Sequence, residues 1–189
     1  MINIAIFASG SGTNTQRIME YFSGSHRISV GLILSNNPNA YVLERARKAK
    51  IPSICFSRKD LYESNYILDL LTVQGITFIV LAGFLWLVPE NILKAYTGRI
   101  INIHPALLPK YGGKGMYGMK VHEAVIASGD KESGISIHYV NQHYDEGQII
   151  FQAKCPVEKV DTPETLAEKV HQLEYRYFPE VIEKLLLRK

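Results

Sequence analysis

A continuous apolar run over residues 77–83 (TFIVLAG) constrains the fold of this chain more than any other segment. Strands that are apolar on both faces are typical of parallel sheets, because helices cover such sheets on both sides. Strand-like and helix-like segments alternate on either side of this run, and that alternation indicates a βαβ series. We therefore predict an α/β fold built on a single doubly wound, mostly parallel sheet.

The elements expected in the first hundred residues follow from apolar periodicity and from helix signals. The first helix carries Ile18, Met19 and Phe22 on one face, and Pro89 stands at the first turn of another. The predicted strands are 2–8, 28–35, about 52–56, 77–83 and 99–104, and the predicted helices are 13–22, 40–49, 59–73 and 89–96.

The last third of the chain follows a different pattern. Two alternating strands, 134–140 and 148–157, flank a short polar turn, which predicts an antiparallel hairpin at the sheet edge. Thr162 and Pro163 begin a C-terminal helix that runs to about residue 178. Its predicted apolar face comprises Leu166, Val170, Leu173 and Tyr177. Pro179 is expected to kink or break this helix before a final turn, 181–187. We expect one domain, 1–189.

Composition limits the classes of partner. The net charge of +3 is too small to favour nucleic acid as the main partner, and it suits a small anionic substrate. Cys55 and Cys155 lie in apolar runs and are expected to be buried free thiols. The amino terminus reads as the first core strand and not as a signal peptide. Because no apolar run reaches transmembrane length, we expect a cytoplasmic protein without membrane or nucleic-acid partners.

Polar side chains follow two of the predicted strands where those strands end. Asn102 and His104 share one face of a β-branched strand that Pro105 stops, and Asp145 lies in the turn after the strand 134–140. Ligands of open α/β sheets bind beyond the carboxyl ends of the strands. An amide, an imidazole and a carboxylate there can stabilise an oxyanion and move a proton. The alternative is a histidine with satisfied hydrogen bonds and ordinary turn residues.

The loop over residues 9–14 (SGSGTN) joins the first strand to the first helix. Its glycines allow a tight backbone, and the helix amides with the Thr13 and Asn14 side chains would form an anion cradle. A dinucleotide fingerprint would need glycine at Thr15 and an acidic residue near Ser35. The loop therefore favours a phosphate monoester over NAD, with a plain tight turn as the alternative.

Three further segments could contribute to a site. The apolar turn 81–89 could hold a flat heteroaromatic ring, although core packing is the favoured explanation of the turn by itself. The glycine-rich loop 110–120 is either a lid or a mobile surface insertion. His171 and Glu174 share a helix face away from the apolar stripe and could touch a ligand, with solvated side chains as the default. His138 and His143 are weaker candidates, and no metal-ligand spacing occurs among the six histidines and two cysteines.

The motifs SGSGTN (9–14), LAGF (81–84), NIHPALLP (102–109) and DEG (145–147) occur together and in this order. In this combination, over essentially its whole length, the chain resembles the phosphoribosylglycinamide formyltransferases, folate-dependent enzymes of purine biosynthesis. The resemblance implies a Rossmann-like formyltransferase fold. It also implies transfer of a formyl group from 10-formyltetrahydrofolate, as co-substrate, to the amine of glycinamide ribonucleotide. It implies no metal, and we expect a monomer or weak homodimer.

The resemblance also implies a set of site residues. Asn102, His104 and Asp145 match the catalytic trio, and the chemistry suggests a protonated His104 whose pKa Asp145 raises. Asn102 and Asp145 also border the cofactor site. The positions matched to nucleotide binding are Gly12, Thr13, Asn14, His171 and Glu174, and those matched to folate binding are Arg58, Leu85, Trp86, Leu87, Val88, Asn141, Gln142, His143, Tyr144 and Asp145.

Two departures from the family pattern limit which site residues can be assigned from the resemblance. Trp86 stands where family members commonly have arginine, and the loop 112–120 is longer than in many relatives. Two kinds of function remain open beside this one. They are another formyl-folate-dependent formyltransferase or hydrolase, and a nucleotide-binding domain without catalysis.

Overall fold

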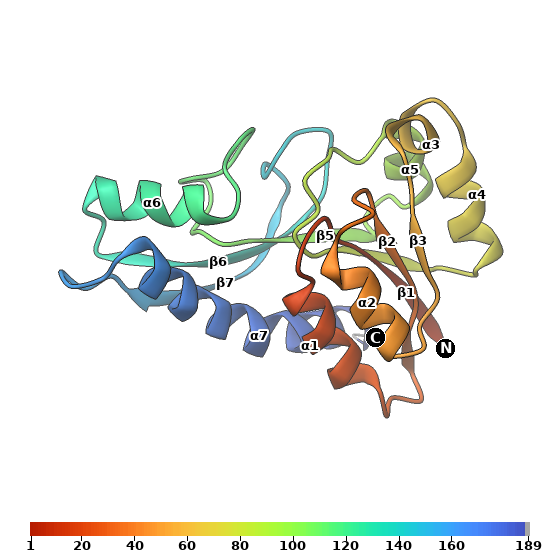
Figure 1. The fold of residues 1–189 in the computed structure, drawn as a ribbon, viewed down its shortest axis with the longest axis horizontal. Coiled ribbons are helices and arrows are strands. Elements are labelled where there is room, and N and C mark those ends of the chain that lie inside the picture. The colour runs from red at the N-terminus through yellow and green to blue at the C-terminus, as the bar shows by residue number, and fades with distance from the viewer. Residues whose placement is uncertain (188–189) are drawn as a thin grey trace. The chain divides into compact units, whose positions relative to one another are not determined.

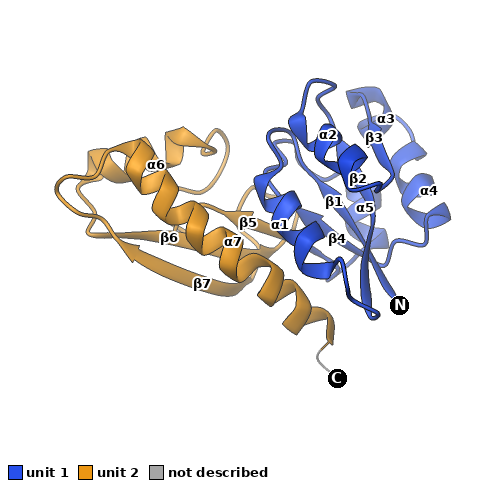
Figure 2. Ribbon diagram, turned by 60° about the horizontal axis from the view of Figure 1, so that its bottom comes forward, with its two compact units in different colours: residues 1–101 blue, residues 102–189 orange. Residues whose placement is uncertain are grey.

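The computed structural model describes residues 1–187 and divides into two compact units, Met1–Ile101 and Asn102–Lys189 (Figure 2). Hydrogen-bonded strands follow the order β3-β2-β1-β4-β5-β6-β7. The strands β1 to β4 lie in the first unit, and β6 and β7 lie in the second. β5 (Ile100–His104) begins in the first unit and ends in the second. The α/β class, the mostly parallel doubly wound order and the C-terminal helix are as predicted.

The first unit alternates strands and helices (Figure 1). Parallel pairing joins β1 to β2, β1 to β4 and β2 to β3. The crossover from β3 to β4 reverses the strand order between β1 and β4, which makes this the topological switch point. Its elements are β1 (Ile2–Phe7), α1 (Thr13–Phe22), β2 (Ile28–Ser35), α2 (Tyr41–Lys48), β3 (Ser53–Cys55), α3 (Arg58–Tyr62), α4 (Tyr66–Val73), β4 (Phe78–Leu81) and α5 (Glu90–Ala95).

The predicted apolar faces account for the core of this unit. Ile18, Met19 and Phe22 of α1 are buried, as expected from their spacing. All four residues of β4 are buried, which matches a strand covered on both faces.

The second unit contains α6 (Met119–Ser128), β6 (Glu132–Tyr139), β7 (Ile149–Pro156) and α7 (Pro163–Leu187). β6 and β7 form the predicted antiparallel hairpin, and α7 runs along them (Figure 2). Thr162 caps α7, since its hydroxyl accepts a hydrogen bond from the Thr165 amide at 3.3 Å.

The helix predicted over 59–73 is wrong in one respect, because the structure has two helices there. A capping box between Ser57 and Asp60 begins α3. Ser64 then interrupts the helix. Its hydroxyl donates to the Asp60 carbonyl at 2.9 Å and accepts from the Tyr66 amide at 3.2 Å. A serine side chain therefore replaces the helical hydrogen bonds at this point.

Of the kink or break predicted at Pro179, the break is wrong, because α7 continues through this residue to Leu187. Proline in a helix interior costs about 3 kcal/mol. Here Phe178, Pro179, Val181 and Ile182 are all buried, so burial of this turn offsets the lost hydrogen bond.

The buried stripe of α7 differs from the predicted one. Leu166, Val170, Glu174 and Phe178 follow one another at intervals of four and are buried, whereas Leu173 and Tyr177 are half-buried. Glu174 thus lies on the apolar stripe and is not the solvated side chain that we expected by default.

The exposure of the cysteines and the presence of helix α6 differ from the prediction. Cys55 and Cys155 are free thiols as predicted, but Cys55 is exposed and Cys155 is partly exposed. Helix α6 was not predicted, although Val121 and Val125 occupy one face and Gly129 ends the helix in a left-handed conformation. Within residues 1–187, no helix is long and apolar enough to cross a membrane.

Gly12 provides a test of the packing between α1 and α2. It has a φ of 70°, and a Cβ built on it would lie 2.5 Å from Cγ2 of Val42. We expect Gly12→Ala to lower the free energy of unfolding by about 2–4 kcal/mol, from left-handed strain plus overpacking. Urea denaturation measures the loss. Gly10→Ala is the control, because a Cβ there meets nothing within 4 Å, and an equal loss in both variants would contradict this packing argument.

Candidate active site

Asn102, His104 and His138 reach the site from the ends of neighbouring strands. β5 ends at His104, with Asn102 two residues earlier on the same face. His138 is next to last in β6, and a register irregularity between Ile137 and His138 lies at this point. Irregularities of this kind re-aim a side chain. His104 and His138 are buried, with side chains 5% and 3% exposed.

Asp145 lies between the two imidazoles. Its Oδ2 is 3.5 Å from Nδ1 of His104, and its Oδ1 is 3.6 Å from Nε2 of His138. The Gly113 amide donates to Oδ2 at 3.0 Å, and Nδ2 of Asn102 donates to Oδ1 at 3.4 Å. The side chain is 11% exposed, so these polar neighbours replace most of its water. The structure thus brings together the three residues predicted from separate segments.

Asp145 adopts an unusual backbone conformation. Its φ is 58°, in the left-handed region that aspartate tolerates better than most residues. A Cβ built on Gly147 would lie 1.6 Å from the Tyr139 carbonyl oxygen, so only glycine fits there. The close return of the chain past Gly147 positions the Asp145 carboxylate over the end of β6.

His138 has a role that the sequence reasoning did not assign. Its Nδ1 lies 2.8 Å from the Tyr139 carbonyl, which can only accept, so Nδ1 carries the hydrogen. In the neutral ring Nε2 is then an acceptor, and Nδ2 of Asn102 donates to it at 3.1 Å. This contact fixes the orientation of the Asn102 amide. Two buried polar residues, Ser136 and His138, on one face of an apolar strand were the available signal.

His104 is held in a similar way. Its Nε2 is 2.7 Å from the Tyr111 carbonyl and therefore carries a hydrogen. Its Nδ1 is the nitrogen that faces Asp145. The neutral ring presents a lone pair to the carboxylate, whereas the imidazolium would present an N–H.

The expected rise in the pKa of His104 is wrong in its net direction. Burial lowers the pKa of His104, and although Asp145 and the Tyr111 carbonyl act to raise it, burial dominates. For Asp145, burial acts to raise the pKa, but His138, His104 and the Gly113 amide together lower it. The pair at neutral pH is therefore an ionised Asp145 beside a largely neutral His104.

A second polar group lies between α6 and α7. His122 is buried with no hydrogen-bond partner at Nδ1, and burial first, then His171 and His104, lowers its pKa to about 4. The ring centroids of His122 and His171 are 6.4 Å apart. Burial also lowers the pKa of His171. His171 and Glu174 were expected from the sequence, whereas His122, a histidine beside Val121 in the unpredicted helix α6, was not.

In the first unit, the loop 9–14 presents an uncapped helix N-terminus. The carbonyls of Ser9, Gly10 and Ser11 accept hydrogen bonds from Asn37, Val42 and Arg45. Within residues 1–187, no N-cap side chain bonds to the first amides of α1, and no acidic residue lies in its first turn. A helix N-terminus of this kind favours an anion. Thr15 is fully buried, in place of the third glycine of a dinucleotide loop.

The turn after β4 lies beside this loop. The Ser9 hydroxyl accepts from the Leu85 amide at 3.0 Å. Leu85 is exposed, Trp86 and Leu87 are part-exposed, and the Val88 side chain packs in the core.

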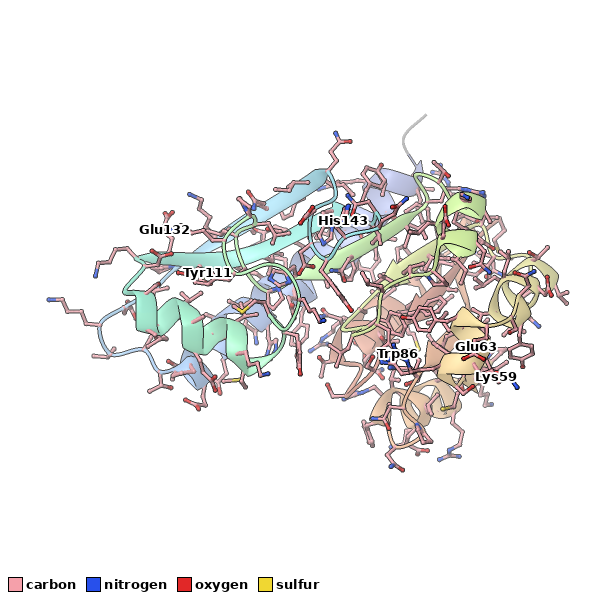
Figure 3. All side chains as sticks on the ribbon, turned by 90° about the horizontal axis from the view of Figure 1, so that it is seen from above. Lys59, Glu63, Trp86, Tyr111, Glu132 and His143 are labelled. Atoms are coloured by element: carbon pink, nitrogen blue, oxygen red, sulfur yellow. The ribbon has the colours of Figure 1, made fainter. Side chains whose placement is uncertain are left out.

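Arg58 of α3 lies over Trp86 of this turn and over Tyr62 of its own helix. Its guanidinium lies 4.9 Å from the Trp86 ring and 5.2 Å from the Tyr62 ring. Figure 3 labels Trp86 in the same region of the view as Lys59 of α3 and Glu63, which directly follows that helix. Trp86 thus lies against the Arg58 cation.

The turn 141–145 is arranged by its own side chains. Asn141 Oδ1 accepts from the His143 amide at 2.9 Å. Gln142 and His143 are exposed, and Tyr144 is part-exposed. Among residues 1–187, no group of three or more His, Cys, Asp or Glu side chains could hold a metal ion.

Comparison with known proteins gives one consistent result. The formyl transferase family matches residues 2–182. Phosphoribosylglycinamide formyltransferase of Bacillus subtilis is 36% identical, over 98% of this chain and 95% of its own length. The chloroplastic enzyme of Arabidopsis thaliana is 42% identical over 95% of this chain. The chain spans 63% of that plant protein and 60% of the one from Vigna unguiculata.

Solved structures agree with the sequence comparison. Phosphoribosylglycinamide formyltransferase from Bacillus halodurans superposes with a TM-score of 0.87 at 38% identity, covering 98% of this chain and 96% of that one. Glycinamide ribonucleotide transformylase 1 from Geobacillus kaustophilus gives 0.89 at 37% identity, covering 98% and 99%. A match over nearly the whole length in both sequence and fold leaves one conclusion: this chain belongs to the formyl transferase family.

Proposed function

We propose that this chain transfers the formyl group of 10-formyltetrahydrofolate to the amine of glycinamide ribonucleotide. The observation that supports this most directly is the cluster of Asn102 and His104 around the buried Asp145, which combines a proton acceptor with an amide donor. The similar proteins carry this activity in their names. We further propose that the chain acts as one cytoplasmic formyltransferase domain, as a monomer or weak homodimer, on small molecules and not on nucleic acid.

The proposed reaction needs no covalent bond to the protein. The amine lone pair forms a bond to the formyl carbon, and the π pair of the carbonyl moves to its oxygen. The amine proton passes to Nδ1 of the neutral His104, directly or through water, and Asp145 stabilises the resulting imidazolium. Collapse re-forms the carbonyl and breaks the bond to the folate nitrogen, which takes the proton from His104.

Asn102 would stabilise the oxygen that becomes negative. One hydrogen of its Nδ2 is held by His138. The other lies toward Oδ1 of Asp145 at a long 3.4 Å, and this weakly bonded hydrogen is the one available to the developing oxyanion. A preorganised donor of this kind is worth about 3–4 kcal/mol in the transition state.

The nucleotide and the folate would use the remaining predicted residues. For the phosphate we propose Gly12, Thr13 and Asn14, with His171 and Glu174 as a further nucleotide segment. For the folate we propose Arg58, the turn after β4 and the turn after β6. The residues are Arg58, Leu85, Trp86, Leu87, Val88, Asn141, Gln142, His143, Tyr144 and Asp145.

The acceptor is tested with the purified chain, 10-formyltetrahydrofolate and three acceptors: glycinamide ribonucleotide, an aminoacyl-tRNA and water. We expect formyl transfer to glycinamide ribonucleotide alone. His104→Ala should reduce turnover by about 10²–10⁴-fold, the usual contribution of a general base. Formyl release to water at a comparable rate would identify a hydrolase instead, and folate binding without turnover would identify a binding protein.

The phosphate cradle is tested with Thr13→Val, which removes a hydroxyl at nearly constant volume. We expect the Kd of glycinamide ribonucleotide to rise roughly tenfold, as for the loss of one hydrogen bond to a charged group, with folate binding unchanged. Calorimetric titration measures both affinities. Ser11→Ala is the matched control, because the exposed Ser11 contacts Arg45 only through its backbone carbonyl in the described interactions. A selective loss of folate binding in Thr13→Val would mean that the two pockets are exchanged.

Asp145→Asn tests the pairing with His104. Asp145 acts to raise the pKa of His104, so the variant should lower that pKa further. Because the base works in its neutral form, the ascending limb of the kcat profile should move to lower pH. At the same time kcat itself should fall, because the amide no longer stabilises the imidazolium. NMR titration of His104 and pH–rate profiles of both proteins provide the measurement. An unchanged His104 pKa together with normal kcat would remove Asp145 from the catalytic pair.

A further inference from the structure

Tyr111 contacts the proposed base through its backbone and the end of a helix through its side chain. Its carbonyl accepts from Nε2 of His104 at 2.7 Å. Its hydroxyl lies 2.6 Å from Oγ of Ser128 and 2.8 Å from Oδ2 of Asp130, at the C-terminal end of α6. All of these residues lie in the second unit.

The groups that hold the Tyr111 hydroxyl are themselves fixed. Lys110 donates to both oxygens of Asp130, at 2.9 and 3.2 Å. Ser128 donates to the Val125 carbonyl at 2.8 Å, which anchors its hydroxyl to the last turn of α6. The ring of Tyr111 is therefore tied at its far end to a helix terminus and to an ion pair.

The backbone of Tyr111 is in a conformation that favours glycine. Its φ is 56°, and glycines occupy the next two positions of the loop. A tyrosine here is disfavoured by its backbone and therefore needs a compensating interaction from its side chain. The hydroxyl anchor supplies such an interaction.

Tyr111 is only partly buried. It borders a cavity of about 410 Å³ that is also lined by Leu107, Lys110, Asp130, Lys131, Glu132 and Ser133. Tyr111 and Glu132 lie toward the same end of the unit in Figure 3. The cavity leaves space beside this residue, so the hydrogen bonds of its hydroxyl contribute to holding it in place.

We propose that Tyr111 is a positioning residue for His104: its anchored side chain holds its carbonyl on Nε2, so that Nδ1 remains the nitrogen that exchanges protons beside Asp145. This inference rests on the proposed role of His104. Without the anchor the carbonyl drifts, the ring can turn or change tautomer, and the base is no longer aligned with the reacting amine.

The test compares Tyr111→Phe with Tyr117→Phe, a tyrosine in the same loop that is exposed. We expect Tyr111→Phe to lower kcat about tenfold, with both KM values within roughly twofold, as for a misaligned group acting only in the transition state. Tyr117→Phe should behave as wild type. Tyr111→Gly separates backbone from side chain: it relieves the left-handed φ but removes the anchor, and it should lose at least as much kcat.

A second readout excludes a merely structural effect. The Tyr111 carbonyl acts to raise the pKa of His104, as does Asp145, whereas His138 acts to lower it and His122 also lies within electrostatic reach. Tyr111→Phe should therefore move the ascending limb of the kcat profile, and the NMR titration of His104, to lower pH. The NMR experiment uses ligand-free protein, so it tests the positioning even if the proposed acceptor proves wrong. Wild-type kcat and His104 pKa in Tyr111→Gly would overturn the proposal.

Discussion

The structure of the second unit depends on one largely buried carboxylate. Asp145 loses most of its water and is compensated by His104, His138, Asn102 and the Gly113 amide. Burial of an ionised group without such partners would cost several kcal/mol. The irregularity at His138 in β6, the left-handed backbone of Asp145 and the close return at Gly147 all serve this arrangement. The local strain is offset by the contacts that it makes possible.

Two backbone carbonyls determine which nitrogens are free for chemistry. The Tyr139 carbonyl makes Nδ1 of His138 the donor, and the Tyr111 carbonyl does the same for Nε2 of His104. The remaining nitrogens both lie near Asp145, but only that of His138 also contacts the Asn102 amide. Hydrogen bonding to acceptors that cannot donate thus gives two similar imidazoles different surroundings, in keeping with the proposed role of His104 as the base.

The first unit uses backbone geometry in another way. The loop after β1 and the turn after β4 meet at the switch point, where the Ser9 hydroxyl binds the Leu85 amide. One side of this junction offers amides at a helix N-terminus, and the other offers aromatic rings with a stacked arginine. Anionic and flat aromatic groups can each find a suitable surface in this unit.

The sequence by itself determined the α/β class, most element boundaries and the candidates Asn102, His104 and Asp145, because apolar periodicity and strand-end polar residues are local signals. Only the tertiary structure decided the rest. Burial keeps α7 helical through Pro179 and places Glu174 on its inner stripe. Desolvation outweighs Asp145 and lowers the pKa of His104, where pairing alone suggested a rise. The parts played by His138 and Tyr111 depend on carbonyls and turns brought together in space. Desolvation and hydrogen bonds between residues far apart in the sequence leave no periodic pattern along the chain. They therefore could not be predicted from the sequence.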